Sequence, residues 1–116
     1  KQMEDIDSLL SAQRTNAKGW IKEIMKVEGI TMLRPNSNVN PNYWVFGLLC
    51  EHKKEAINAF KEKGFYATGV HINNNVYSVF NNKVNLKGVN EFMNHFVAIP
   101  SGWWVKKQKC KIIDIK

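Results

Sequence analysis

With 116 residues, 44% of them hydrophobic, the chain has the length of one domain and can bury a single core. Its net charge of +7 comes almost entirely from lysine, with only Arg14 and Arg34 as arginines, so we expect a solvated surface and no nucleic-acid partner. Cys50 and Cys110 lack the dense spacing of a secreted disulfide framework, and no apolar run could cross a bilayer, so we expect a soluble, cytoplasmic protein.

The first half of the chain predicts a helix followed by two strands. Residues 6–25 carry apolar side chains at spacings of three and four, the pattern of one long amphipathic helix. A short strand over 30–33 and a polar, proline-containing connection over 34–42 follow. The apolar run 43–50 predicts a strand buried on both faces at the centre of a sheet, with Trp44 in the core.

The second half predicts further helices and strands. Residues 51–63 place apolar and charged side chains on opposite faces of a helix, which Gly64 can end in a left-handed conformation. The remaining elements, in order, are a strand over 66–71, an asparagine turn over 73–75, a short segment over 76–80, a helix over 89–96, a strand over 97–100 and an ambiguous final segment over 105–116. This order predicts an α+β domain with helices packed on a small, largely antiparallel sheet.

The sequence contains no motif of a self-contained active site. His52, His71 and His95 are scattered, and none has the spacing of a metal-ligand set. Cys50 and His52 would share a strand face, but two ligands do not make a site. Phosphate-binding glycine loops and a nucleophile elbow are also absent from the sequence, so we expect no metal site and no catalytic residue in this chain.

Three stretches are unusual for a plain core domain: residues 70–78, the pair Tyr43 and Trp44, and residues 100–105. Their His, Asn, Tyr and Trp side chains can hydrogen-bond to a polar ligand and stack on it. Adjacent tryptophans cannot both enter one core, so we expect one indole of the "PSGWWV" turn to be buried and the other to face outward. For the polar cluster after residue 70, packing and ligand binding are equally good interpretations.

Taken in order, "QRTNAKGW", "YWVFGLLCEHKKEAINAFKEKGFYATGVH" and "FVAIPSGWWV" resemble the C-terminal part of the DegT family. These are pyridoxal-phosphate (PLP) dependent aminotransferases of nucleotide sugars, with the aspartate aminotransferase fold type. The resemblance extends over nearly the whole chain from about Glu4. It implies that residues 1–29 form a helix from a large upstream domain and that residues 30–116 form the small C-terminal domain. The start at Lys1, directly in helical periodicity, fits the same expectation.

The resemblance also implies a function that this chain cannot carry out alone. In the family, the large domain supplies the Schiff-base lysine, the aspartate that pairs with the pyridine nitrogen and most phosphate contacts. We therefore expect PLP in the full-length protein and none bound to this chain alone. The implied reaction transfers an amino group, with glutamate as donor, to a keto-sugar nucleotide. The implied partners are the large PLP-binding domain and, for the full-length protein, a second copy in a homodimer.

Because the family's small domain folds over the edge of the active-site cleft, the resemblance implies a set of substrate-binding residues here. These are His71, Asn73, Asn74, Trp103 and Trp104. His71 matches a histidine at the corresponding strand end. In relatives, an arginine and an aspartate flank a central asparagine, whereas this chain has three asparagines over 73–75. This difference puts recognition of the substrate by charge in doubt here. The segment Lys106–Gln108 also differs from the family, whose last helix begins with a Ser or Thr cap and acidic residues. Lysines at that position are disfavoured by the positive end of the helix dipole.

Two other functions remain open from the sequence. One is a stand-alone α+β binding module that uses its basic surface for nucleic acid or an acidic partner. The other is a purely structural interaction domain. An upstream coding sequence with a cofactor lysine would favour the aminotransferase over both.

Overall fold

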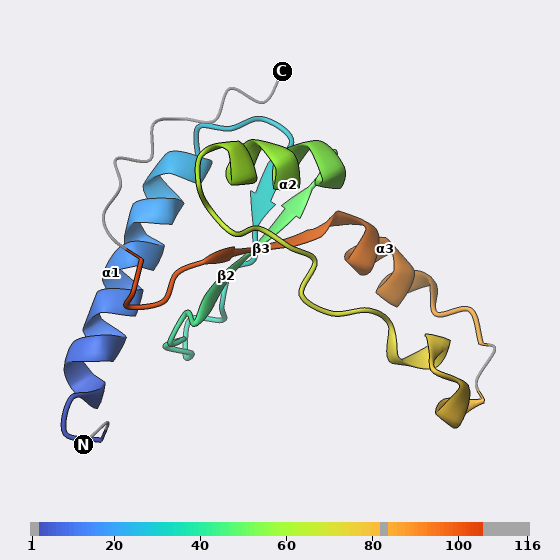
Figure 1. Cartoon of the computed structure of the whole chain (residues 1–116), viewed down its shortest axis with the longest axis horizontal. Coiled ribbons are helices and arrows are strands. Elements are labelled where there is room, and N and C mark those ends of the chain that lie inside the picture. The colour runs from blue at the N-terminus through green and yellow to red at the C-terminus, as the bar shows by residue number, and fades with distance from the viewer. Residues whose placement is uncertain (1–2, 82–83, 106–116) are drawn as a thin grey trace.

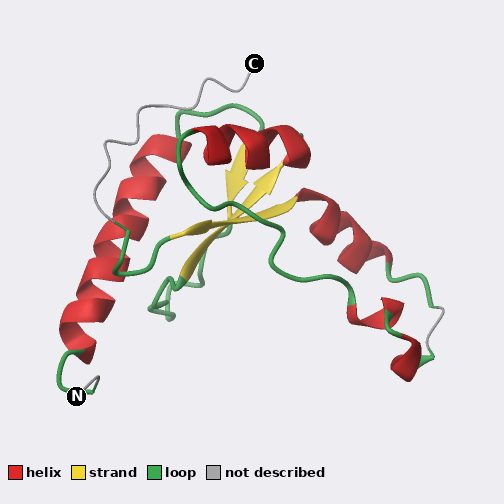
Figure 2. Cartoon of the chain, viewed as in Figure 1, coloured by secondary structure: helices red, strands yellow, loops and turns green. Residues whose placement is uncertain are grey.

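A computed structural model describes residues 3–81 and 84–105 of the chain. Three helices and three strands form a two-layer α+β structure, which confirms the predicted fold class (Figures 1 and 2). The elements in chain order are α1 (Ile6–Ile24), β1 (Ile30–Met32), β2 (Val45–Cys50), α2 (Lys53–Glu62), the short helical turns η1 (Asn74–Val76) and η2 (Ser78–Phe80), α3 (Lys87–His95) and β3 (Phe96–Pro100).

The sheet has the order β1-β2-β3, and both pairs are antiparallel. The apolar run therefore forms the central strand, as predicted, with Leu48 opposite Met32 on one side and Val97 on the other. The two faces of β2 differ, however. Phe46, Leu48 and Cys50 are buried, whereas the alternate residues are only half-buried, so the prediction of a strand buried on both faces is wrong.

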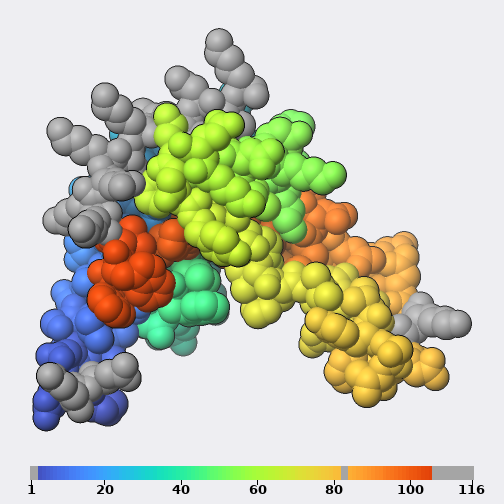
Figure 3. Space-filling model, viewed as in Figure 1, coloured from blue at the N-terminus to red at the C-terminus, as the bar shows by residue number. Residues whose placement is uncertain are grey.

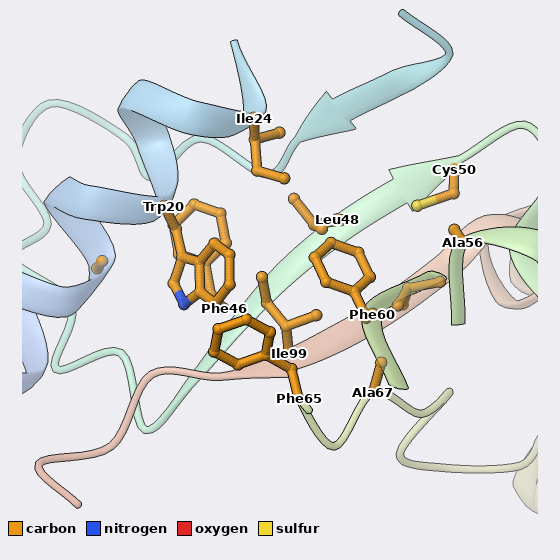
Figure 4. Close-up of a cluster of buried hydrophobic side chains, with 12 residues drawn as sticks. Trp20, Ile24, Phe46, Leu48, Cys50, Ala56, Phe60, Phe65, Ala67 and Ile99 are labelled. Carbon is orange, nitrogen blue, oxygen red and sulfur yellow. The ribbon is translucent and has the colours of Figure 1, made fainter. Parts of the chain in front are cut away.

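The core lies between this buried face and the helices α1 and α2. Trp20 of α1 fills its centre, edge-on to Phe60 at 6.0 Å and to Phe65 at 4.8 Å between ring centroids (Figure 4). The other buried members come from the helices, the two longer strands and the segment after α2: Ala17, Ile24, Phe46, Leu48, Cys50, Ala56, Ala67, Val97 and Ile99. The core thus joins α1 to the rest of the described chain.

Two further predicted features of the fold are wrong. Residues 66–71 do not form a strand, because only Thr68 pairs with Ala98, and Val70 turns the backbone away at a φ of 61°. Trp44 is not a core residue, since 57% of it is exposed. Strand β2 begins at Val45, after Tyr43 in a left-handed conformation, and the buried face starts at Phe46.

The molecule has the outline of an inverted V (Figure 3). Helix α1 and the turn after β3 form one limb, and η1, η2 and α3 form the other, with the sheet and α2 at the apex (Figure 1). The radius of gyration is 16.0 Å. A compact domain of this length has a radius of about 13 Å, so the chain is more open than a closed globule. The ambiguous segment beyond Val105 lies outside the described residues.

No helix in the described ranges is long and apolar enough to span a membrane.

Candidate functional site

The turn that follows β3 is held by polar side chains of α1. The indole Nε1 of Trp20 donates to the Pro100 carbonyl at 3.0 Å. One turn earlier on the helix, Asn16 donates from Nδ2 to the carbonyls of Gly102 at 2.9 Å and Val105 at 3.3 Å. Ser101 is fully buried and donates from Oγ to the Gln13 carbonyl at 3.4 Å. The turn is therefore fixed to the helix at four points, not only by its proline and glycine.

Both tryptophans of the turn are partly exposed, Trp103 at 54% and Trp104 at 56%. The expectation that one of them packs inside the core is therefore wrong. Their rings meet edge to face at 5.8 Å between centroids. A Cβ atom at Gly102 would overlap the ring of Trp104, so this ring lies directly over the glycine backbone. The glycine is needed for this close approach, which removes part of the Trp104 surface from solvent.

Trp103 lines an open groove against the N-terminal half of α1. The groove has a volume of about 440 Å³, and the helix contributes hydroxyl and amide side chains to it. Its lining consists of Ser8, Ser11, Ala12, Thr15, Asn16, Trp103 and Val105. An indole face beside several hydroxyl groups can stack on a flat or sugar-like ligand while the hydroxyls hydrogen-bond to it. Of the two tryptophans, Trp103 is thus the one placed for ligand contact.

His71 and the asparagines lie where the chain leaves the apex for the second limb. His71 and Asn74 are exposed. Asn73 is half-buried and donates from Nδ2 to Oδ1 of Asn90 at 2.8 Å, and Asn90 donates to Oδ1 of Asn85 at 2.9 Å. Asn73 therefore ties this segment to α3, whereas His71 and Asn74 present their side chains to solvent.

The structure does not bring the five predicted substrate-binding residues together within this chain. The segment with His71 and Asn74 leads into one limb of the V, and the turn with Trp103 lies against α1 in the other (Figure 1). A ligand would need a further protein surface between the limbs to contact both groups. The two clusters are therefore separate elements of any site to which they contribute.

Cys50 and His52 line a pocket of about 260 Å³ together with Glu28 and Glu51. Burial raises the pKa of the Cys50 thiol to about 11, and the nearby charge of Lys53 opposes the rise. The thiol is thus protonated near neutral pH and a poor nucleophile. No group of three or more potential metal ligands occurs among residues 3–81 and 84–105.

Sequence reasoning missed the residues that position the turn. Asn16 donates to the turn, and Gln13 on the same helix face accepts from Ser101 through its backbone carbonyl while its side chain donates to the Asn42 carbonyl at 3.0 Å in the connection before β2. A signal for this role was present, because Gln13 falls within the apolar stripe of the helix, where a polar side chain needs a partner. An apolar pocket of about 410 Å³ between Met25, Leu33 and Tyr43 was also missed, and no sequence pattern marks it.

Comparison with solved protein structures identifies the fold. No protein-family model and no curated protein matches the sequence. Among solved structures, sugar aminotransferase CalS13 from Micromonospora echinospora superposes with a TM-score of 0.82 at 24% identity, over 90% of this chain and 29% of that one. AtS13 from Actinomadura melliaura gives 0.82 at 24% identity, over 91% and 29% of the two chains. The Helicobacter pylori aminotransferase PseC, involved in the biosynthesis of pseudoaminic acid, gives 0.73 at 16% identity, over 91% and 31%.

The chain therefore has the α+β fold found in one part of sugar aminotransferases. It spans less than a third of the length of the solved structures that it matches. At sequence identities of 24% or less, the structural similarity shows the fold but not the activity. The activity has to be argued from the residues of this chain.

Proposed function

We propose that this chain is the C-terminal small domain of a PLP-dependent aminotransferase that moves an amino group from glutamate to a keto-sugar nucleotide. The observation that carries the proposal is the match to CalS13, which covers almost all of this chain and 29% of that enzyme. The order of the "SAQRTNA" helix, the "TGVH" segment and the "PSGWWV" turn supports the same assignment, since these stretches resemble the DegT family.

The described residues of this chain do not fit PLP by themselves. A PLP site needs a lysine that can form a Schiff base beside a group that pairs with the pyridine nitrogen. Lys53 is half-buried, but its Nζ already donates to the Met93 carbonyl at 2.6 Å. No lysine lines any of the three pockets described above. The proposal therefore assigns the cofactor and its lysine to a domain outside this chain.

Within this proposal, the chain contributes substrate contacts and not chemistry. Trp103 would stack on the nucleotide sugar from its groove, and the exposed side chains of His71 and Asn74 would contact a polar part of the same substrate. Trp104 would instead hold the turn closed over Gly102. The cofactor supplies the electron sink for amino transfer, and the protein around it positions the substrate.

The coding sequence upstream of Lys1 gives the first test. An α/β domain with a cofactor lysine in the same reading frame supports the proposal, and a stop codon or an unrelated domain removes it. The isolated chain, reduced with borohydride in the presence of PLP, should not incorporate stoichiometric label on any lysine. Such labelling would contradict the assignment of the cofactor to another domain.

The second test measures nucleotide-sugar binding to the longer polypeptide by calorimetry. A stacked aromatic is worth about 1–3 kcal/mol, so Trp103→Ala should weaken binding by about fivefold to a hundredfold. His71→Ala should also weaken it, while the cofactor absorbance and the half-reaction with glutamate stay unchanged. Trp44→Ala is a matched control, because Trp44 is equally exposed but lies outside both clusters. Parent-like binding by the folded Trp103 and His71 variants would show that these residues only pack.

A further inference from the structure

The apolar pocket between Met25, Leu33 and Tyr43, here called the Met25 pocket, lies between the C-terminal half of α1, the end of β1 and the connection to β2. Its volume of about 410 Å³ is within the range of pockets that hold small molecules. Apart from Arg34, the described side chains that line it are apolar or aromatic. Met25 is 68% exposed, so the pocket presents an uncovered thioether in a concave apolar surface.

One side of the Met25 pocket is aromatic. Tyr43 stacks on Phe46 at 5.9 Å between ring centroids, with 26° between the ring planes. Met25 of α1 and Met32 of β1 add two thioether groups to the lining. Thioether sulfur makes favourable contacts with aromatic rings, and stacked rings extend readily to a further ring. The lining therefore favours a ligand with a flat aromatic body.

The aromatic side of the pocket is held in place by the surrounding chain. Tyr43 has a left-handed backbone at a φ of 54°, which costs free energy for a bulky residue. The connection that leads to it is fixed to α1, because Gln13 donates to the Asn42 carbonyl at 3.0 Å and Arg14 donates from Nε to the Pro41 carbonyl at 3.4 Å. The pocket thus needs little ordering when a ligand binds, which favours affinity.

Arg34 supplies the charge of the Met25 pocket. It alone is charged among the described residues that line the pocket. Its side chain is exposed and has neither an ion pair nor a hydrogen bond within residues 3–81 and 84–105. A free guanidinium can hold a carboxylate through two parallel hydrogen bonds. With no second cation in the described lining, the pocket matches a single negative charge better than a phosphate dianion.

We propose that the Met25 pocket binds a small aromatic carboxylate, with its ring against Tyr43 and Phe46 and its carboxylate on Arg34. A protein partner is a poorer match, because a specific interface takes about 20–30 residues on each side, whereas eight described residues line this pocket. The proposed function uses none of these residues, so the inference is independent of the aminotransferase assignment.

The experiment titrates naphthoate into the chain by calorimetry, with the uncharged naphthalenemethanol as the control ligand. Naphthoate should bind one-to-one with a dissociation constant of about 1 mM or lower. Arg34→Gln should weaken naphthoate binding by about three- to tenfold and leave naphthalenemethanol binding unchanged. Lys61→Gln is the matched control, because it removes the same charge from an exposed position on α2 and should change neither. Met25→Gln should weaken both ligands, since it makes an exposed side chain of the pocket polar without reaching the core.

Oxidation of methionines by peroxide locates the ligand. Naphthoate should slow the oxidation of Met25 several-fold and leave Met3, which is 80% exposed and lies outside the pocket, unchanged. The proposal is wrong if naphthoate does not saturate the chain, if Met25 is not protected, or if Arg34→Gln binds it as tightly as the parent. Protection of Met25 that grows with protein concentration in the absence of ligand would also overturn it, since a second copy would then occupy the pocket.

Discussion

Removing the side-chain amide of Asn16 should destabilise the chain at the turn that carries both tryptophans. Asn16→Ala deletes the hydrogen bonds to the carbonyls of Gly102 and Val105, each worth about 0.5–1.5 kcal/mol. Alanine recovers about 0.6 kcal/mol of helix propensity at the same position. The expected net loss in the free energy of unfolding is therefore about 0.5–2.5 kcal/mol. For a domain of this size, 1 kcal/mol corresponds to about 4–8 °C in Tm.

Thr15→Ala is the matched control for this measurement. Thr15 is exposed and its hydroxyl donates to the Ser11 carbonyl one turn back in the same helix, so the substitution gains similar propensity and removes no hydrogen bond to the turn. Urea unfolding followed by tryptophan fluorescence gives both stabilities, and circular dichroism reports the edge-to-face pair Trp103 and Trp104. If Asn16→Ala is as stable as Thr15→Ala and the indole signal is unchanged, the amide does not hold the turn.

Three further predictions concern the core, the buried thiol and the charge. Trp20→Ala should cost about 3–5 kcal/mol in urea unfolding and Trp44→Ala no more than about 0.5 kcal/mol, and equal losses would contradict their assigned burial. Because the pKa of Cys50 is raised from 9.0 to about 11, the unfolded thiol ionises first. Stability should then fall by about 2 kcal/mol from pH 9 to 11 relative to Cys50→Ala, and parallel pH curves would refute this. Binding to duplex DNA should be negligible at physiological salt, and a steep salt dependence of measurable binding would favour the binding-module alternative.

The helices and the central strand could be predicted because their patterns are local. Periodic apolar side chains mark α1 and α2, and an unbroken apolar run marks β2, whatever the rest of the chain does. Burial of individual residues could not be predicted in the same way. Trp44 is apolar and lies next to β2, but its exposure depends on where the strand begins, which Tyr43 and its left-handed backbone decide. Val70 ends a predicted strand for the same reason, since β-branched residues rarely adopt its φ.

The candidate site was predictable only in part. The sequence marks the turn at residues 100–105 as unusual, but the side chains that hold it are 80 or more residues away in α1. Contacts at such separations depend on the sheet that brings β3 next to α1, and no short pattern encodes them. The division of roles between Trp103 and Trp104 depends on a ring that folds back over Gly102, which is likewise a tertiary feature.

Helix α1 therefore has a second role besides filling the core. Its buried side reaches the sheet through Trp20, while Gln13 and Asn16 on the same side bind backbone carbonyls of the connection before β2 and of the turn after β3. The groove beside Trp103 is lined by residues 8–16 in the N-terminal half of the same helix. A change in the direction of α1 relative to the sheet would thus break these hydrogen bonds and open the groove at once. If α1 links this chain to a larger domain, as the family resemblance implies, movement of that domain would change the shape of the Trp103 groove through these three side chains.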